Sequence, residues 1–196
     1  MTKKTEIKFT QEELDSLNIE VHRVKGGTLL HKSGNRTLKL PNKIERFLRS
    51  VSQLFWLPDN KKGWIKPGFA KAKEIVKERN IDLVFASAPP YSNLMLAKMI
   101  KDEFDLPVVM DLRDEWLESH FISYPSSFHR SKMESLELET LRVADQLITI
   151  NSNIADSSNS RKVNKKEVEV IPHGFDHEDF KKMEEKPVNT NTISFL

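Results

Sequence analysis

Two short apolar runs near the middle of the chain flank one amphipathic segment of helix length. Residues 83–86 and 106–110 are apolar without alternation, which is typical of parallel strands covered on both faces. Between the two runs, charged residues fall mostly on one side of a predicted helix, and the other side carries Leu94, Leu96, Ala97, Ile100 and Phe104. Residues 81–116 therefore predict a βαβ unit whose helix packs on the sheet.

The segment before this unit predicts one strand and two helices. Residues 19–24 alternate between apolar and polar, as a half-buried strand does. A helix is predicted over residues 64–79, where Pro67 is tolerated in the opening turn. The most amphipathic helix of the chain is predicted over residues 41–55, with apolar side chains at helical intervals: Ile44, Phe47, Leu48, Val51, Leu54 and Phe55.

Helices and strands continue to alternate after the βαβ unit. A surface loop over residues 117–129 is expected to precede a helix over residues 130–143. Further elements are predicted from the same periodicities: a strand at 145–150, a helix capped at 151–153, a strand at 168–171, and the beginning of a strand at 193–196. The whole pattern predicts an α/β fold, a Rossmann-like parallel sheet with helices on both faces.

Composition narrows the class of protein. With 196 residues, one domain is the default. The net charge of +2 arises from 31 basic and 29 acidic residues, so charge gives no indication of nucleic-acid binding. The absence of cysteine excludes disulfides and thiolate ligands and is compatible with a reducing cytosol. No apolar run is long enough to span a membrane, and no secretion signal is recognisable.

Polar side chains follow each strand of the βαβ unit, at the edge where open α/β sheets bind ligands. Asp111, Arg113 and Asp114 come directly after the second strand, where carboxylates can act as a base and an arginine can hold a phosphate. The alternative is an ordinary charged turn locked by an Arg–Asp pair. Residues 87–92 lead into the helix, and they are either an anion or sugar site or a plain helix start stiffened by two prolines.

Several motifs that indicate other functions do not occur. The six histidines show neither a metal-binding spacing nor a hydrolase triad, and the chain contains neither a P-loop nor GxGxxG. We therefore expect no metal. The basic helix predicted at 41–55 either contacts an anionic membrane surface peripherally or packs its apolar face on its own domain.

Five segments, taken in order, resemble the N-terminal domain of glycosyltransferase family 4, whose members have the GT-B fold. The segment from Trp56 to Trp64 resembles the family's "PD…W" helix entry, and residues 81–92 resemble its "DvI.ssPP.s" strand and helix start. Residues 107–116 resemble "P.v.DfRD.W", residues 137–148 resemble "E……AD.vi", and residues 171–180 resemble the "iPNGvD…F" hinge. Two departures are the arginine at 113, where many members carry histidine, and the histidine at 173, where asparagine is usual.

The resemblance implies a function and a role for individual residues. The intact reaction would be retaining transfer of a sugar from a nucleotide-sugar donor to an acceptor hydroxyl, in glycan or cell-envelope polysaccharide synthesis, without an obligatory metal or other cofactor. Asp111, Arg113 and Asp114 would be catalytic. The resemblance also implies two sets of supporting residues: substrate contacts at Ser87, Pro90, Tyr91, Ser92 and Trp116, and a hinge at Pro172, His173, Gly174 and Asp176.

The resemblance also implies which parts of the family fold this chain would carry. Residues 1–180 would form an incomplete acceptor-side domain, and residues 181–196 a linker and the start of a second domain. The family's first strand and its donor-gripping C-terminal domain have no counterpart here, so we expect this chain alone to be inactive. A complementary chain would then supply the missing domain, and the location would be cytoplasmic or peripheral on the inner membrane face. The alternatives are a non-catalytic binding module, half of a split enzyme, or an epimerase-like GT-B fragment.

Overall fold

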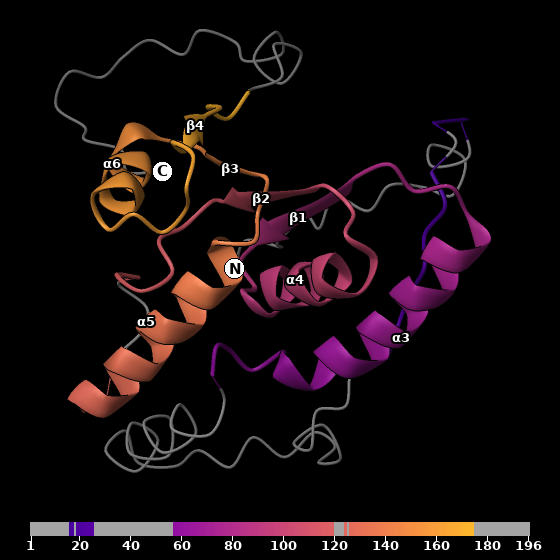
Figure 1. The fold of residues 1–196 in the computed structure, drawn as a ribbon, viewed down its shortest axis with the longest axis horizontal. Coiled ribbons are helices and arrows are strands. Elements are labelled where there is room, and N and C mark those ends of the chain that lie inside the picture. The colour runs from indigo at the N-terminus through magenta and orange to yellow at the C-terminus, as the bar shows by residue number, and fades with distance from the viewer. Residues whose placement is uncertain (1–15, 18, 26–56, 120–123, 125, 175–196) are drawn as a thin grey trace, which may run out of the picture.

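The structure is a computed structural model that describes residues 16–17, 19–25, 57–119, 124 and 126–174. Its centre is a parallel sheet of four strands in the order β1-β2-β3-β4. The strands are β1 (Val84–Ala88), β2 (Val108–Leu112), β3 (Gln146–Thr149) and β4 (Glu169–Val170). The helices are α3 (Lys62–Glu78), α4 (Ser92–Phe104), α5 (Ser127–Leu141) and α6 (Ser152–Ser160). The predicted α/β class with a parallel, Rossmann-like sheet is confirmed (Figure 1).

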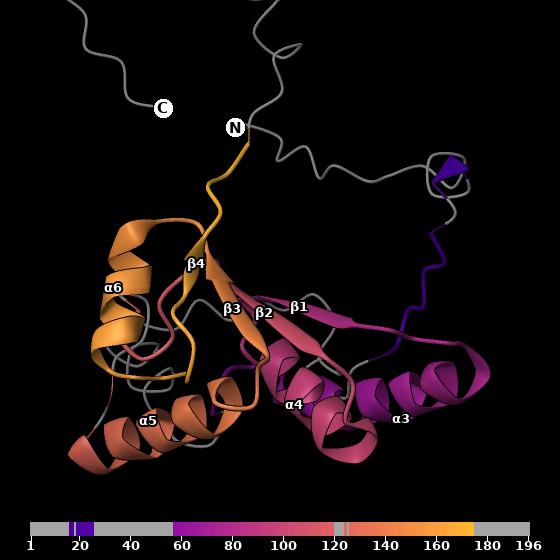
Figure 2. The same ribbon diagram turned by 45° about the horizontal axis from the view of Figure 1, so that its top comes forward.

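The sequence predicts helices on both faces of the sheet, but the described helices all lie to one side of it (Figure 2). The core forms between them and one sheet face, where Val108, Met110 and Leu147 have an exposed fraction of 0 %. Helix α3 packs against α4. A Cβ atom added to Gly68 of α3 would lie 3.3 Å from the side chain of Leu96 on α4. The small residue at 68 therefore allows the two helices to approach closely.

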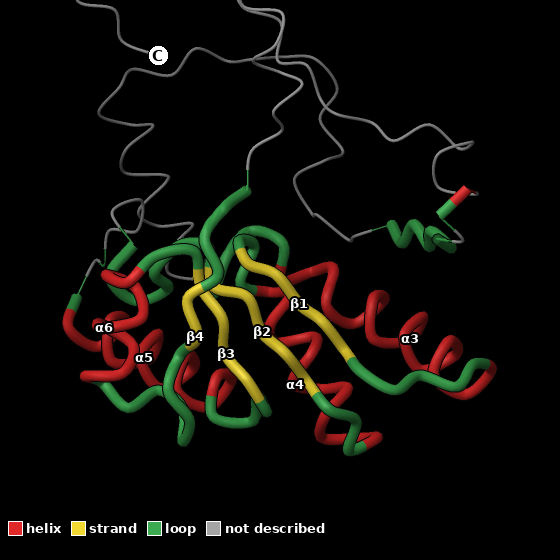
Figure 3. Tube along the Cα trace, turned by 90° about the horizontal axis from the view of Figure 1, so that it is seen from above, coloured by secondary structure: helices red, strands yellow, loops and turns green. Residues whose placement is uncertain are grey.

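Along each strand, every second side chain points away from the core, to the second face of the sheet. We call it the open face and define it by Phe85, Ser87, Val109, Asp111 and Ile148, which the strand register places on one side. Figure 3 looks onto this face and shows no helix of the described part of the chain in front of the strands.

Three predictions of element boundaries need correction. Strands β1 and β2 each extend two residues beyond the predicted apolar run, so Ser87 and Asp111 belong to strands and not to loops. An apolar run ends at the first polar side chain, whereas the backbone ladder continues past it. Helix α5 begins at Ser127, three residues before the predicted start. Pro67 is the sixth residue of α3 and so lies beyond the opening turn, where it removes one helical hydrogen bond.

The strand predicted over residues 19–24 is wrong. These residues form no strand, and Ile19 and Val21 are 47 % and 42 % exposed. The carboxylate of Glu20 instead pairs with the guanidinium of Arg79 at 3.0 Å, just beyond α3. The helix predicted at 41–55 and the strand predicted at 193–196 lie outside the described residues.

Candidate functional site

Ser87 and Asp111 are direct neighbours across β1 and β2, near the carboxyl ends of both strands. The Ser87 hydroxyl donates a hydrogen bond to Oδ2 of Asp111 at 2.7 Å. The Asp111 residue is only 5 % exposed, so its carboxylate requires such donors to offset its lost hydration. The side-chain amide of Asn93 in turn donates to the backbone oxygen of Ser87 at 2.9 Å, which ties α4 to the same point.

Arg113 supplies the second donor to this carboxylate. Its Nε donates to Oδ2 of Asp111 at 3.0 Å, and its backbone N–H donates to the carbonyl of Ala88 at 3.1 Å. The side chain of Arg113 is 53 % exposed, against 7 % for that of Asp111. The pair therefore presents a fixed guanidinium to solvent while its carboxylate stays buried, and a guanidinium held this way can bind a phosphate or carboxylate through its terminal nitrogens.

Asp114, the third residue predicted to be catalytic, lies next to this cluster but does not join its hydrogen bonds within the described residues. It is exposed, and its charge is one cause of the raised pKa of Tyr91, after burial. An exposed carboxylate at the edge of the sheet can accept a hydrogen bond from the hydroxyl of a ligand.

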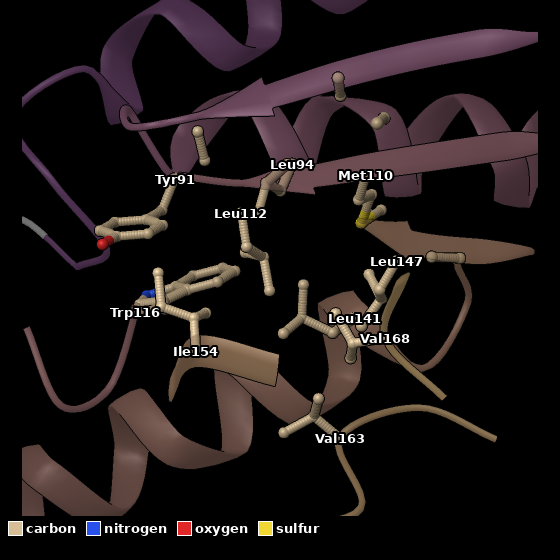
Figure 4. Packing of buried hydrophobic residues seen from close by; sticks show 14 of the residues in the cluster. Tyr91, Leu94, Met110, Leu112, Trp116, Leu141, Leu147, Ile154, Val163 and Val168 are labelled. Atoms are coloured by element: carbon tan, nitrogen blue, oxygen red, sulfur yellow. The ribbon is translucent and has the colours of Figure 1, made fainter. Parts of the chain in front are cut away.

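Tyr91 and Trp116 lie inside the core and not on its surface. Their rings stack with centroids 4.9 Å apart and an angle of 12° between the planes (Figure 4). The Tyr91 hydroxyl donates to the carbonyl of Glu115 at 2.6 Å, and the Trp116 indole N–H donates to the sulfur of Met133 at 3.2 Å. Tyr91 is 6 % exposed and Trp116 is 1 % exposed, so both rings anchor the loop after β2 to the core.

Ser92 begins α4 and is engaged by a residue far away in the chain. Asp59 accepts the backbone N–H of Ser92 at 2.8 Å and its hydroxyl at 2.5 Å. The carboxylate thus occupies the position that an anionic ligand would take at a helix N-terminus. Ser92 is fully buried, whereas Pro90 is exposed at the surface beside it.

A buried ion pair fixes the far end of the loop that carries Arg113. Glu137 of α5, 1 % exposed, accepts the backbone N–H of Leu117 at 3.3 Å. The same carboxylate accepts hydrogen bonds from both terminal nitrogens of Arg161, which lies just after α6. The loop after β2 is therefore held by the β1–β2 ladder at one end and by two helices at the other.

Sequence reasoning did not identify Asp59, Glu137 or Arg161 as supports of the site. Asp59 and Glu137 occur in motifs that resemble the family, but spacing alone gave no indication of their partners, which lie 33 and 24 residues away. Arg161 belongs to no such motif, and only the three-dimensional fold brings it to Glu137, 24 residues away.

The predicted hinge residues follow β4. Pro172, His173 and Gly174 are exposed, and Asp176 lies outside the described residues. A separate groove of about 450 Å³ runs along α3 and is lined by Lys66, Phe69, Lys73 and Lys77 with Met99 of α4. Within the described ranges, no three histidine, aspartate or glutamate side chains converge as metal ligands would, and no helix is long and apolar enough to cross a bilayer.

The fold is an α/β domain with a parallel, Rossmann-like sheet, and charged residues lie at the carboxyl edge, where open sheets of this class usually bind ligands. The family model described as Glycosyltransferase Family 4 matches residues 11–179. The chain therefore belongs to glycosyltransferase family 4, as the five motifs predicted. Comparisons with curated proteins and with solved structures gave no match.

Proposed function

We propose that this domain forms the acceptor-side wall of a glycosyltransferase site, at the carboxyl edge of β1 and β2. One observation carries the proposal. The buried carboxylate of Asp111 holds the half-exposed guanidinium of Arg113 at the end of a strand, with a second hydrogen bond from Ser87. Because that guanidinium is fixed through Nε, its terminal nitrogens are preorganised for an anionic group.

The chemistry proposed is retaining transfer from a nucleotide sugar to a hydroxyl. The bond between the anomeric carbon and the donor diphosphate breaks, a bond to the acceptor oxygen forms on the same face of the sugar, and the acceptor proton leaves with the diphosphate. Arg113 would stabilise negative charge near the sugar, and Asp114 would orient the acceptor hydroxyl. Asp111 would act on Arg113 and not on the substrate, because its carboxylate is buried behind that side chain.

The proposal extends to the surroundings of the site. The opposite wall, which grips the nucleotide diphosphate, would come from a second domain or a complementary chain, and transfer would need no metal. The protein would act in the cytoplasm. These points are what the resemblance of the motifs to the family implies.

Calorimetry with a panel of nucleotide sugars and glycan fragments tests the proposal. We expect measurable binding to the 196-residue chain and a loss of at least about tenfold in affinity in Arg113→Gln, the cost of one charge-assisted contact. Arg142→Gln is the matched control, since Arg142 is exposed at the end of α5. Equal binding by Arg113→Gln and wild type would contradict the assignment.

Retention and metal independence are tested together once a productive second domain is supplied. The product of an α-linked donor should be α-linked by NMR, and a chelator should leave the rate unchanged. An inverted product, or a rate that the chelator abolishes, would contradict that part of the proposal.

A further inference from the structure

The groove along α3 is formed by one side of that helix, and Met99 of the neighbouring α4 closes it (Figure 2). Its volume of about 450 Å³ is within the range of clefts that bind ligands. Five of its lining residues recur at helical intervals and so lie along one side of α3: Lys66, Phe69, Ala70, Lys73 and Lys77. The first and last of these lysines are about 16 Å apart along the helix axis, at 1.5 Å per residue.

The middle of the groove is apolar. Phe69 and Met99 are partly buried there, and Ala70 is exposed between the lysines. The ammonium group of Lys73 lies 5.3 Å from the centre of the Phe69 ring and pairs with the carboxylate of Glu103 on α4 at 2.7 Å. The groove is therefore an apolar hollow whose central lysine already has an acidic partner.

The two ends of the groove carry positive charge that the described residues leave unpaired. Glu74, the acidic residue that also lines the groove, pairs with Lys71 at 2.8 Å. Lys66 and Lys77 are exposed, and no carboxylate in the described part of the chain lies within ion-pair distance of either. A matching occupant therefore needs two negative charges about 16 Å apart, with apolar groups between them.

An amphipathic α-helix has this arrangement, because carboxylates three turns apart lie on the same face as the apolar side chains between them. We propose that the groove binds an acidic amphipathic helix of a partner protein. Its two carboxylates pair with Lys66 and Lys77, and its apolar side chains fill the hollow between Phe69 and Met99. The inference goes beyond the proposed transferase site and does not depend on it.

An anionic membrane matches this surface less well than a helix does. Helices that lie on membranes insert projecting apolar side chains below the headgroups, and none of the large exposed apolar side chains among the described residues belongs to α3. The side chains of Glu74 and Glu103 are 58 % and 45 % exposed at the same surface. Their negative charges oppose contact with anionic headgroups.

Fluorescence anisotropy with two synthetic peptides tests the proposal. The first is an alanine-based helix with two glutamates three turns apart and leucines between them on the same face, and the second has lysines in place of the glutamates. Wild type should bind the glutamate peptide at least about tenfold more tightly than the lysine peptide. The double variant Lys66→Glu/Lys77→Glu should reverse this preference, which also shows that the variant is folded. Lys132→Glu, at an exposed position on α5, is the matched control and should keep the wild-type preference.

The variant Ala70→Lys separates apolar contact from charge, because it adds a positive charge but fills the hollow. The glutamate peptide should bind this variant at least about fivefold more weakly than wild type, whereas a purely electrostatic site would bind it more tightly. Three outcomes would overturn the proposal: equal binding of the two peptides to wild type, unchanged or tighter binding by Ala70→Lys, and sedimentation with vesicles of phosphatidylglycerol and phosphatidylcholine that Lys66→Glu/Lys77→Glu abolishes while neither peptide binds. The third outcome would identify a membrane as the occupant.

Discussion

Ser87 and Asp111 face each other across β1 and β2, and the serine hydroxyl donates to the aspartate carboxylate at 2.7 Å. Arg113 donates to the same oxygen from the other side, at 3.0 Å. Asp111, which holds the guanidinium, and Ser87, which supports Asp111, thus both stand on strands, whose ladder fixes their separation. The geometry of the site is therefore set by the sheet and less by the loop that follows it.

Removal of the serine hydroxyl should weaken the carboxylate's support. Ser87→Ala leaves Asp111 buried with one donor fewer, and we expect a loss of about 1–3 kcal/mol in the free energy of unfolding. Urea unfolding followed by circular dichroism measures it. Ser131→Ala, on the exposed side of α5, is the control and should change stability by less than about 0.5 kcal/mol. Indistinguishable values for the two variants would show that the hydrogen bond adds no stability.

The two tyrosines of the chain give a spectroscopic test of the core around the site. Burial raises the pKa of Tyr124 to about 12, and burial together with the nearby charge of Asp114 raises the pKa of Tyr91 still more. Absorbance at 295 nm should therefore show little phenolate in the folded protein at pH 10.5, whereas both tyrosines titrate near pH 10 in urea.

The same shifts predict how stability depends on alkaline pH. Since the folded-state pKa values are raised, the stabilisation is fully present below the unfolded value near 10 and declines as the pH rises toward the folded values. Tyr91→Phe should leave a single transition near pH 12. A folded-state titration near pH 10 would indicate that the stacked pair of Tyr91 and Trp116 is open to solvent.

The ion pair between Glu137 and Arg161 should be strongly coupled. Arg161→Met leaves a carboxylate that is 1 % exposed with no cationic partner, and such single losses cost about 3–5 kcal/mol. The double variant Glu137→Leu/Arg161→Met removes both charges and should recover most of that loss. A double-mutant cycle with both single variants measures the coupling energy. Additive effects of the two substitutions would contradict a direct interaction, and Arg142→Met controls for the general loss of an arginine.

Asp59 should stabilise α4 from a distance in sequence. Asp59→Ala removes the acceptor for the Ser92 N–H and hydroxyl, with an expected cost of about 0.5–2 kcal/mol, as for a helix cap. Asp59→Asn keeps one acceptor oxygen and should lose less than Asp59→Ala. Thermal denaturation distinguishes the two variants. Equal destabilisation of Asp59→Asn and Asp59→Ala, or no destabilisation of either, would contradict a capping role for Asp59.

The apolar periodicity predicted the elements of the described sheet because strand and helix patterns depend on local burial. The runs at 83–86 and 106–110 located β1 and β2. The capped helix start predicted at 151–153 is the start of α6, where the side chain of Asn151 accepts the N–H of Ile154 at 3.0 Å. The alternation at 19–24 failed because no strand of the described sheet pairs with it. A pattern of period two indicates a strand only where a neighbouring edge is available.

The sequence predicted some residues of the candidate site, but not what each side chain contacts. Asp111 and Arg113 were identified from their place after a strand, and the structure joins them in one cluster. Tyr91 and Trp116 were predicted as substrate contacts, yet their rings are buried in the core. Whether an aromatic side chain beside a strand end faces inward depends on packing against distant helices, which sequence spacing does not encode.

Amide shift mapping of the isotope-labelled chain tests the central claim most directly. Titration with a nucleotide sugar and with a glycan fragment should shift the amide resonances of residues 87, 88, 91 and 92 and of residues 111–116, and Arg113→Gln should reduce those shifts at equal ligand concentration. Residues 66–77, along the groove of α3, should stay unchanged. Shifts confined to that groove, or shifts at residues 111–116 that Arg113→Gln leaves intact, would contradict a site at the carboxyl edge of β1 and β2.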